Sequence, residues 1–299
     1  MLTHWEPMAE TATRVNDELV AAGEPDGGLA LVRHVASPRL RGVARDYWGY
    51  AEQTAGPLRR RELPSADIIF IVNLGAPLLV AQPWSAPRLI PTGGSFVAGL
   101  HERYALTETA GSQAGVELRL SPLGAYRLLG QSMDALANRS VPLDQVCGVW
   151  AGELADRLQA ALTWDDRFAA FDAVLAARLV DAHDPAPEVV WAWQQLTISR
   201  GRVPIATLSE ELGWSPKRLI ARFREQVGLP PKQVARLLRF QCVTNLFLAT
   251  ETPDWVALAR QCGYYDQSHL IHEFQRFAGD TPNGLMRRRL ATGGGFAAD

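Results

Sequence analysis

The sequence predicts an α+β protein of two domains. The first is an N-terminal antiparallel β barrel-like module with a helical hairpin, and the second is a C-terminal all-α domain of two helix-turn-helix motifs joined by a helix. Short β-rich runs separated by Pro and Gly continue to about residue 121, the apolar spacing becomes helical after Pro122, and the last third contains an internal repeat. The 299 residues are enough for two domains with separate cores.

The N-terminal part is predicted to consist of short antiparallel strands. Runs rich in β-branched and aromatic residues are separated by turn formers such as Gly75, Pro83 and Gly111. Many short strands at this spacing are typical of a small antiparallel barrel or sandwich. The predicted strands are 29–35, 46–52, 66–75, 76–82, 95–101, 103–109 and 115–121.

Two helices are predicted to close the first domain. In residues 143–162 apolar side chains recur every four residues from Val146 to Leu158, which places them on one helix face, and residues 167–180 form a second helix. A segment with two prolines follows and is predicted to be a linker. The predicted organisation is therefore a first domain at 1–183, a linker at 184–190, a second domain at 191–290 and a flexible tail at 291–299.

An internal repeat is the strongest signal in the chain. Residues 205–231 and 256–282 align with an offset of 50 residues before a glycine turn and 51 residues after it. Because turns tolerate insertions, a one-residue slip at this point supports the alignment. The matched pairs are Leu208 with Leu258, Gly213 with Gly263, Leu219 with Leu270, Phe223 with Phe274, Gly228 with Gly279, and Pro231 with Pro282.

Each copy has the local signals of a helix-turn-helix. In the first copy Gly213 can end a helix with a positive φ, Ser215 can cap the next helix, and Pro216 suits its first turn. Gly263 and Asp266 take the same places in the second copy. A buried stripe is predicted on the second helix of each copy, formed by Leu219, Phe223 and Val227 and by Leu270, Phe274 and Phe277.

The second helix of each copy carries side chains that suit DNA. The major groove admits one α-helix, whose N-terminal residues face the base edges. Arg and Lys pair with guanine there, and Gln pairs with adenine. The residues outside the buried stripe include Lys217, Arg218, Arg222 and Arg224 in the first copy, and Gln267, Ser268, His269, Ile271 and His272 in the second.

Residues 232–250 are predicted to form one helix between the two copies. At 1.5 Å per residue this helix spans roughly 25–30 Å. It could therefore hold two recognition helices about one DNA turn, or about 34 Å, apart. Lys232, Arg236 and Arg239 on this helix are the predicted phosphate contacts.

The charge distribution also favours a nucleic-acid partner for the C-terminal part. From Arg200 to Asp299 there are 14 Lys and Arg residues against 9 Asp and Glu residues, a net charge of +5. The totals of 30 and 32 leave 16 basic and 23 acidic residues, a net charge of −7, for the rest of the chain. A basic segment on an otherwise acidic chain is typical of a nucleic-acid-binding end, although a solvated basic face is the alternative.

These motifs resemble the AraC/XylS family of transcription regulators over about residues 190–290. The run GYYDQSHLIHEFQRFAGDTP (263–282) is similar to the family signature, and RFREQVGLPPKQVARLLRF (222–240) resembles its first motif and connecting helix. The resemblance implies two helix-turn-helix subdomains joined by a helix. It also implies a sequence-specific DNA-binding transcription regulator whose two recognition helices read successive major grooves.

The resemblance further implies which residues face DNA. The first recognition helix would offer Lys217, Ile220 and Ala221, and the second would offer Gln267, Ser268, His269 and His272. Where the family often has Arg, this chain has Ala221 and His272, with Arg222 one position along. The predicted DNA-contacting set is Ser215, Lys217, Arg218, Ile220, Ala221, Arg222, Gln267, Ser268, His269 and His272.

The N-terminal domain resembles that of a subgroup of the family, which implies effector sensing or dimerisation. An arginine run at 59–61 could hold an anionic effector, with solvated loop charges as the alternative. Aromatic residues could line an apolar effector pocket or fill the barrel. The candidates for this pocket are Trp48, Tyr50, Phe70, Phe96 and Tyr104.

Two other functions compete with DNA reading. A Cys147-dependent alkyl transfer would need a neighbour that lowers the thiol pKa, and the sequence around Cys147 offers none. A protein-binding helical domain would not need the basic surplus. His269, His272 and Cys262 lack the ligand spacing of a zinc site. We therefore expect no enzyme activity, no cofactor and no metal.

The remaining composition predicts a cytoplasmic protein. Three widely spaced cysteines argue against a disulfide framework, no run approaches the roughly 20 apolar residues of a membrane span, and no secretory signal begins the sequence. The expected partner is double-stranded DNA, without membrane contact. RNA polymerase, an unidentified small-molecule effector and a second copy of the chain are further candidates.

Overall fold

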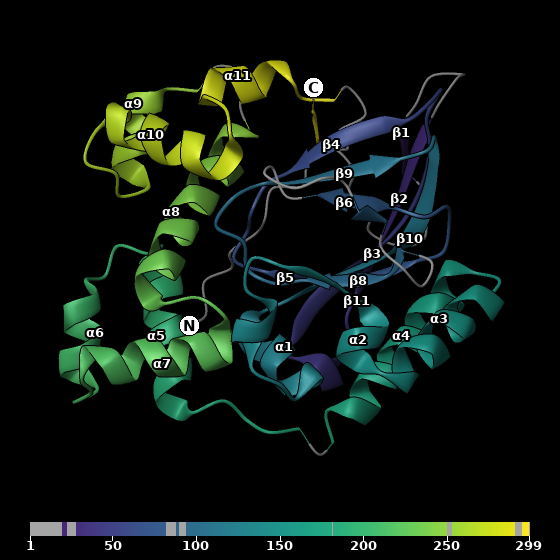
Figure 1. Ribbon diagram of the computed structural model, residues 1–299, viewed down its shortest axis with the longest axis horizontal. Helices are drawn as coiled ribbons and strands as arrows, with labels where there is room; N and C mark the ends of the chain where they lie inside the picture. The colour runs from purple at the N-terminus through teal and green to yellow at the C-terminus, as the bar shows by residue number, and fades with distance from the viewer. Residues whose placement is uncertain are drawn as a thin grey trace.

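The computed structural model describes residues 20–22, 28–81, 88–89, 94–180, 182–249, 253–290 and 295–298. A β-rich part and a helical part lie side by side, and the C-terminal end of the chain returns to the β-rich part (Figure 1). The predicted α+β class with a helical C-terminal region is confirmed. None of the described helices combines the length and the apolar character needed to cross a lipid bilayer.

Two antiparallel sheets form the β-rich part (Figure 1). The strands are β1 (Val20–Ala22), β2 (Gly28–Val35), β3 (Ala44–Gln53), β4 (Leu58–Glu62), β5 (Ile68–Asn73), β6 (Leu79–Ala81), β7 (Arg88–Leu89), β8 (Phe96–Ala98), β9 (Ala105–Thr109), β10 (Ser112–Leu120), β11 (Ser140–Pro142) and β12 (Phe296–Ala297). The larger sheet has the order β1-β2-β3-β10-β5-β8-β11, and the smaller has the order β12-β4-β9-β6-β7. Across the described strands the predicted barrel-like module is therefore a two-sheet sandwich, without a closed barrel.

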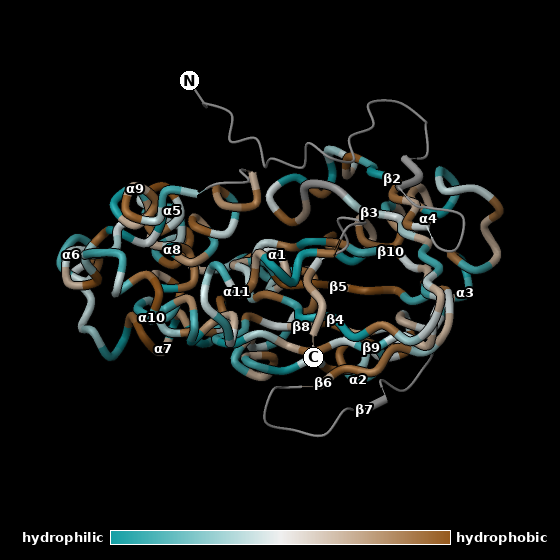
Figure 2. Tube along the Cα trace, turned by 90° about the horizontal axis from the view of Figure 1, so that it is seen from above, coloured by the Kyte–Doolittle hydropathy of each residue, from teal (hydrophilic) through white to brown (hydrophobic). Residues whose placement is uncertain are grey.

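The centre of the larger sheet is buried on both faces. Strand β10 pairs with β3 on one side and β5 on the other. Its residues Val116, Leu118 and Leu120 alternate toward the main core and are fully buried. On the opposite face of β5, Ile71 packs with Val80 of β6, between the two sheets. Burial on both faces explains why the trace of β5 is hydrophobic over most of its length (Figure 2).

Helices pack against the larger sheet on the face away from the smaller one (Figure 1). Phe168 and Phe171 are fully buried and contact the ring of Tyr47 on β3. The single helix predicted at 143–162 is divided, because Gly148 takes a φ of 61°. The elements are η1 (Pro38–Leu40), α1 (Pro122–Leu129), η3 (Met133–Leu136), α2 (Leu143–Cys147), α3 (Val149–Ala160) and α4 (Trp164–Arg178).

The helical part follows the predicted repeat. Its helices are α5 (Pro187–Ile198), α6 (Ile205–Glu211), α7 (Pro216–Val227), α8 (Pro231–Phe247), α9 (Trp255–Gln261), α10 (Gln267–Ala278) and α11 (Pro282–Arg287). The first motif is α6 with α7, and the second is α9 with α10. Helix α8 joins them, and its 17 residues span about 25 Å.

The two parts share one hydrophobic core. Helix α7 packs against α1 and η3, and strand β12 pairs with β4. Phe296 on β12 is buried beside Phe247 of α8. Of the tail predicted to be flexible at 291–299, the structure describes residues 295–298, which include β12. Its other positions lie outside the described residues.

Candidate nucleic-acid interface

The first candidate recognition helix, α7, is amphipathic. Leu219, Phe223 and Val227 have no exposed surface, which fixes the helix against the core as the repeat predicted. The hydroxyl of Ser215 caps α7 by accepting the N–H of Arg218 at 3.3 Å. The other predicted DNA-contacting residues of this motif are all exposed on the opposite face: Lys217, Arg218, Ile220, Ala221 and Arg222.

Two arginines of α7 have local partners that restrict them. The guanidinium of Arg218 lies 4.3 Å from the centre of the Trp214 ring, and Trp214 is itself nearly buried. This stacking holds Arg218 near the start of the helix. Arg222 donates to Glu225 at 2.7 Å, but both side chains are well exposed. An exposed pair of this kind is weak, so Arg222 can exchange Glu225 for another acceptor.

The second candidate recognition helix, α10, has the same construction. Leu270, Phe274 and Phe277 are buried, and the carboxylate of Asp266 accepts the N–H of His269 at 2.7 Å. The exposed side of its first two turns carries polar rather than cationic groups. The predicted residues Gln267, Ser268, His269 and His272 are all exposed there.

His269 is oriented by the turn that precedes α10. The backbone N–H of Tyr265 donates to Nδ1 of His269 at 3.3 Å, and the imidazole meets the Tyr264 ring edge-on at 5.3 Å. The first contact uses Nδ1 as an acceptor, so Nε2 is the atom left to meet a base or phosphate. Tyr265 is 91% exposed beside it. Tyr265 is not among the predicted DNA-contacting residues, although it directly precedes Asp266, the predicted cap of this helix.

The three predicted phosphate contacts on α8 have different surroundings. Lys232 is exposed at the start of the helix. Arg239 donates to the carbonyl of Gly201 at 2.6 Å. Arg236 makes two hydrogen bonds to the carboxylate of Glu273, at 2.7 and 2.6 Å. The guanidinium groups of Arg236 and Arg239 are therefore turned toward the protein, whereas the Lys232 side chain is exposed to solvent.

The Arg236–Glu273 pair joins α8 to α10. The two side chains are 14% and 7% exposed. Burial opposes ionisation of Glu273, but its hydrogen bonds to Arg236 and the arginine charge outweigh that effect and lower the pKa of the carboxyl. Nearby, Phe240 of α8 stacks on Phe277 at 4.8 Å. Helix α8 and α10 are thus held by both an ion pair and an aromatic cluster.

The β-rich part contacts the C-terminal end of α10. Tyr104, between β8 and β9, donates its backbone N–H to the carbonyl of Phe277 at 2.7 Å. Arg61 donates to the carbonyl of Ala278 at 2.7 Å, and its guanidinium lies 4.5 Å from the centre of the Tyr104 ring. A Cβ at Gly279 would lie 2.1 Å from this ring, so glycine is required there. Helix α10 is therefore anchored at the end opposite its predicted DNA-contacting residues.

The predicted aromatic pocket residues do not all lie on one surface. Phe70 faces the helices and contacts Trp150 and Phe171, while Phe96 lies between the sheets with Ile71. Tyr104 is at the contact with α10. Trp48 lies beside Arg33, and the phenol of Tyr50 lies over Gly115. Cross-strand pairing places Trp48, Tyr50 and Phe96 on the face of the larger sheet toward the smaller one, whereas strand alternation turns Phe70 to the opposite face.

Three carboxylates lie near the phenol of Tyr50. Burial raises the pKa of the Tyr50 hydroxyl, and the charges of Glu117, Glu62 and Glu52 raise it further. Glu52 forms a buried ion pair with Arg60. The arginine run at 59–61 is therefore part of β4 rather than a solvated loop. Arg60 meets Glu52, Arg61 contacts the end of α10, and Arg59 pairs with Glu108 at 2.9 Å.

The cysteines also differ from expectation in one respect. Cys242 of α8 and Cys262 at the end of α9 form a disulfide. The sequence did not indicate this pairing, because it depends on how α8 and α9 pack. Cys147 is buried, and burial raises its thiol pKa to about 12, so a reactive thiolate is disfavoured. No group of three or more metal-ligating side chains occurs among the described residues.

Comparisons with known proteins agree with this geometry. Residues 208–288 match a family model described as a helix-turn-helix domain, which extends from α6 to the end of α11. No curated protein matches the chain.

Several solved structures are similar to the chain. The C-terminal domain of AraT, a response regulator from Geobacillus stearothermophilus, is 25% identical, with 36% of this chain and 88% of that chain covered and a TM-score of 0.33. ToxT from Vibrio cholerae O395 is 10% identical, with 88% and 98% covered and a TM-score of 0.44. ToxT from strain SCE256 bound to an unsaturated fatty acid is 12% identical, with 78% and 96% covered and a TM-score of 0.42.

Proposed function

We propose that this chain, a DNA-binding transcription regulator with an AraC-type helix-turn-helix domain at residues 208–288, reads DNA by placing α7 and α10 in successive turns of the major groove. One observation carries the proposal. Both second helices are capped at the end that carries their exposed polar residues, and both are packed onto the single helix α8. A shared support of about 25 Å suits two recognition helices on one face of a duplex.

The two helices would read different bases. Helix α7 offers Lys217, Arg218 and Arg222, which suit guanine or phosphate oxygens. On α10, Gln267 can pair with adenine through two hydrogen bonds, and His269 can donate from Nε2. The proposed operator therefore has two dissimilar boxes, a guanine-containing box for α7 and an adenine-containing box for α10.

The phosphate contacts are assigned more narrowly than the sequence suggested. Lys232 is exposed at the start of α8 and is the proposed backbone contact. Arg236 and Arg239 would have to abandon Glu273 and the Gly201 carbonyl to reach a phosphate. We assign these two arginines to positioning the second motif relative to α8.

The β-rich module is proposed to sense an effector. The phenol of Tyr50 with the carboxylates of Glu52, Glu62 and Glu117 suits a small molecule that donates hydrogen bonds or carries a positive charge. A signal there has a direct route to DNA, because Arg60 and Arg61 are neighbours on β4 and Arg61 contacts the end of α10. Contacts with RNA polymerase and with a second copy stay predictions.

Selection from a random DNA library with the full chain tests the function. The expected result is a motif with two boxes centred about one helical turn, 10–10.5 base pairs, apart. Arg222→Ala should change preference in one box only. Its matched control is Arg157→Ala, an exposed arginine on α3, which should leave the motif unchanged. The absence of any enriched motif would refute sequence-specific reading.

A further inference from the structure

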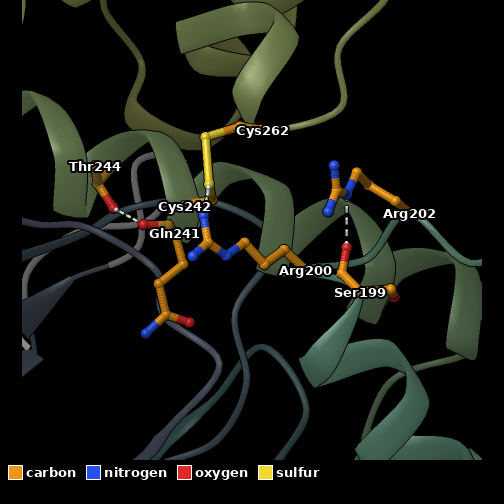
Figure 3. Close-up of a disulfide and its surroundings, with 7 residues drawn as sticks. All are labelled: Ser199, Arg200, Arg202, Gln241, Cys242, Thr244 and Cys262. Atoms are coloured by element: carbon orange, nitrogen blue, oxygen red, sulfur yellow. Dashed lines mark hydrogen bonds between the residues drawn. A yellow bond between two sulfur atoms is a disulfide. The ribbon is translucent and has the colours of Figure 1, made fainter. Parts of the chain in front are cut away.

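The disulfide lies at the turn of the second motif. Cys262 is the C-terminal cap of α9 and is followed by Gly263, whose φ of 79° turns the chain toward α10. Its partner Cys242 is on α8, 20 residues earlier (Figure 3). The covalent bond therefore fixes the turn that precedes α10 to the helix that both motifs share.

An arginine from the turn after a third helix lies against this bond. Arg200 follows the end of α5, and its side chain reaches Cys242 with Nη1 at 3.8 Å from Sγ (Figure 3). Arg200 has a φ of 52°, a left-handed conformation that is uncommon for a residue with a Cβ. The neighbouring Ser199 carbonyl accepts a hydrogen bond from Arg202 at 3.0 Å. A cation held beside one sulfur stabilises its thiolate when the bond opens.

Other contacts keep the second motif folded when the disulfide opens. The Arg236–Glu273 ion pair and the stack of Phe240 on Phe277 hold α10 on α8 without help from sulfur. None of these contacts reaches the turn at Gly263. Opening the bond would therefore remove the covalent tie between this turn and α8 while the body of α10 stays in place.

From this arrangement we infer that Cys242 and Cys262 are a thiol–disulfide exchange site that controls how the second motif reads DNA, with low-molecular-weight disulfides and dithiols as its reagents. The inference depends on the proposed DNA-reading function. The disulfide-bonded form binds its DNA site more tightly than the reduced form, because a fixed turn holds Gln267, Ser268 and His269 in place before binding.

Exchange begins at Cys242, which is 8% exposed whereas Cys262 has no exposed surface. In oxidation, the Cys242 thiolate attacks glutathione disulfide and releases one glutathione thiolate. The Cys262 thiolate then attacks the mixed disulfide at Cys242 and releases the second glutathione. Two protein thiols lose two electrons and two protons, and one glutathione disulfide becomes two glutathiones. Reduction by a dithiol runs through the same atoms and leaves the reductant as its cyclic disulfide.

The test equilibrates the full chain in glutathione buffers, counts thiols by mass spectrometry after alkylation, and measures affinity for the selected operator. The oxidised chain should bind at least about fivefold more tightly than the reduced chain, a typical coupling between two sites. Scrambling the α10 box should abolish this difference, whereas scrambling the α7 box should preserve it. Cys242→Ser/Cys262→Ser should bind like the reduced chain and ignore glutathione. Its matched control, Cys147→Ser, should keep the redox response.

Arg200→Gln adds a second measurement, the rate of oxidation, which a change in stability alone would not affect. It should slow oxidation by glutathione disulfide several-fold while the oxidised chain keeps its affinity for the operator. Equal affinity of the oxidised and reduced chains, or a pair that glutathione disulfide never oxidises, would overturn the inference and leave the proposed function intact. A chain that selects no motif in either state would instead overturn the proposed function.

Discussion

Removing the Glu273 carboxylate separates a structural role of Arg236 from a phosphate-binding role. In Glu273→Ala the Arg236 guanidinium stays in a site where its side chain is 14% exposed, and it loses both hydrogen bonds to the carboxylate. Leaving a buried charge without its partner costs about 3–5 kcal/mol. The expected result is a loss of that size in the free energy of unfolding, measured by urea denaturation.

A matched exposed pair supplies the control. Arg222 and Glu225 are also joined at 2.7 Å, but their side chains are 44% and 39% exposed. Glu225→Ala should therefore cost no more than about 1 kcal/mol. The double variant Arg236→Met/Glu273→Leu should recover most of the stability lost in Glu273→Ala, because it removes both buried charges and keeps the volume.

The same pair predicts a pH dependence. The folded pKa of Glu273 lies below its ordinary value of 4.5, so the carboxylate stabilises the fold above that value. This stability should be lost as the pH falls from about 4.5 through the lower folded pKa, and Glu273→Ala should not show that part of the loss. Urea titrations at a series of pH values measure it.

One outcome would refute the reasoning about Arg236. If Arg236→Met left the free energy of unfolding unchanged but reduced the salt slope of DNA binding by about one, the guanidinium would be a phosphate contact in the complex. Equal losses in Glu273→Ala and Glu225→Ala would likewise show that the pair is not effectively buried.

Three further outcomes are expected. Phe274→Ala should destabilise the chain by about 2–5 kcal/mol in thermal or urea unfolding, because it empties a fully buried site. Gln267→Ala should leave stability unchanged and relax preference at one base pair by about 1–3 kcal/mol in competition binding, whereas the exposed Gln159→Ala on α3 should do neither. Lys232→Ala should weaken binding to all sequences alike and lower the salt slope by about one, and a sequence-dependent effect would contradict its assignment to phosphate.

The sequence predicted the second domain well because its signals are local. A glycine, a capping residue and apolar side chains four residues apart define each motif within about 20 residues, so Ser215, Asp266, Leu219 and Phe274 could be placed without knowing any tertiary contact. The exposed faces of α7 and α10 then follow from helix geometry.

The partners of buried polar groups could not be predicted in the same way. Arg236 and Glu273 are 37 residues apart, and Cys242 and Cys262 meet only because α8 packs beside α9. Nothing in the sequence around Arg236 and Lys232 shows that Arg236 is paired inside the protein whereas Lys232 is exposed.

Prediction of the strands in the first domain was limited for the same reason, because their tertiary contacts are not visible in the local sequence. Alternation predicted β5 but could not tell which face Phe70 would take. The run at 58–62 did not resemble a strand because it is charged. Its arginines are paired only by residues distant in sequence, including Glu52 and Glu108 on other strands.

The anchoring of α10 by Tyr104 and Arg61 gives this proposed recognition helix the properties of a lever. Its pivot is at Phe277 and Ala278, and its 12 residues place the end that carries Gln267 about 18 Å away. A tilt of about 5° at that pivot would carry the tip about 1.5 Å, whereas a working side-chain constellation tolerates only about 0.5 Å. A rearrangement of the sandwich too small to change its fold would therefore be large enough to bring Gln267 into or out of register with a base.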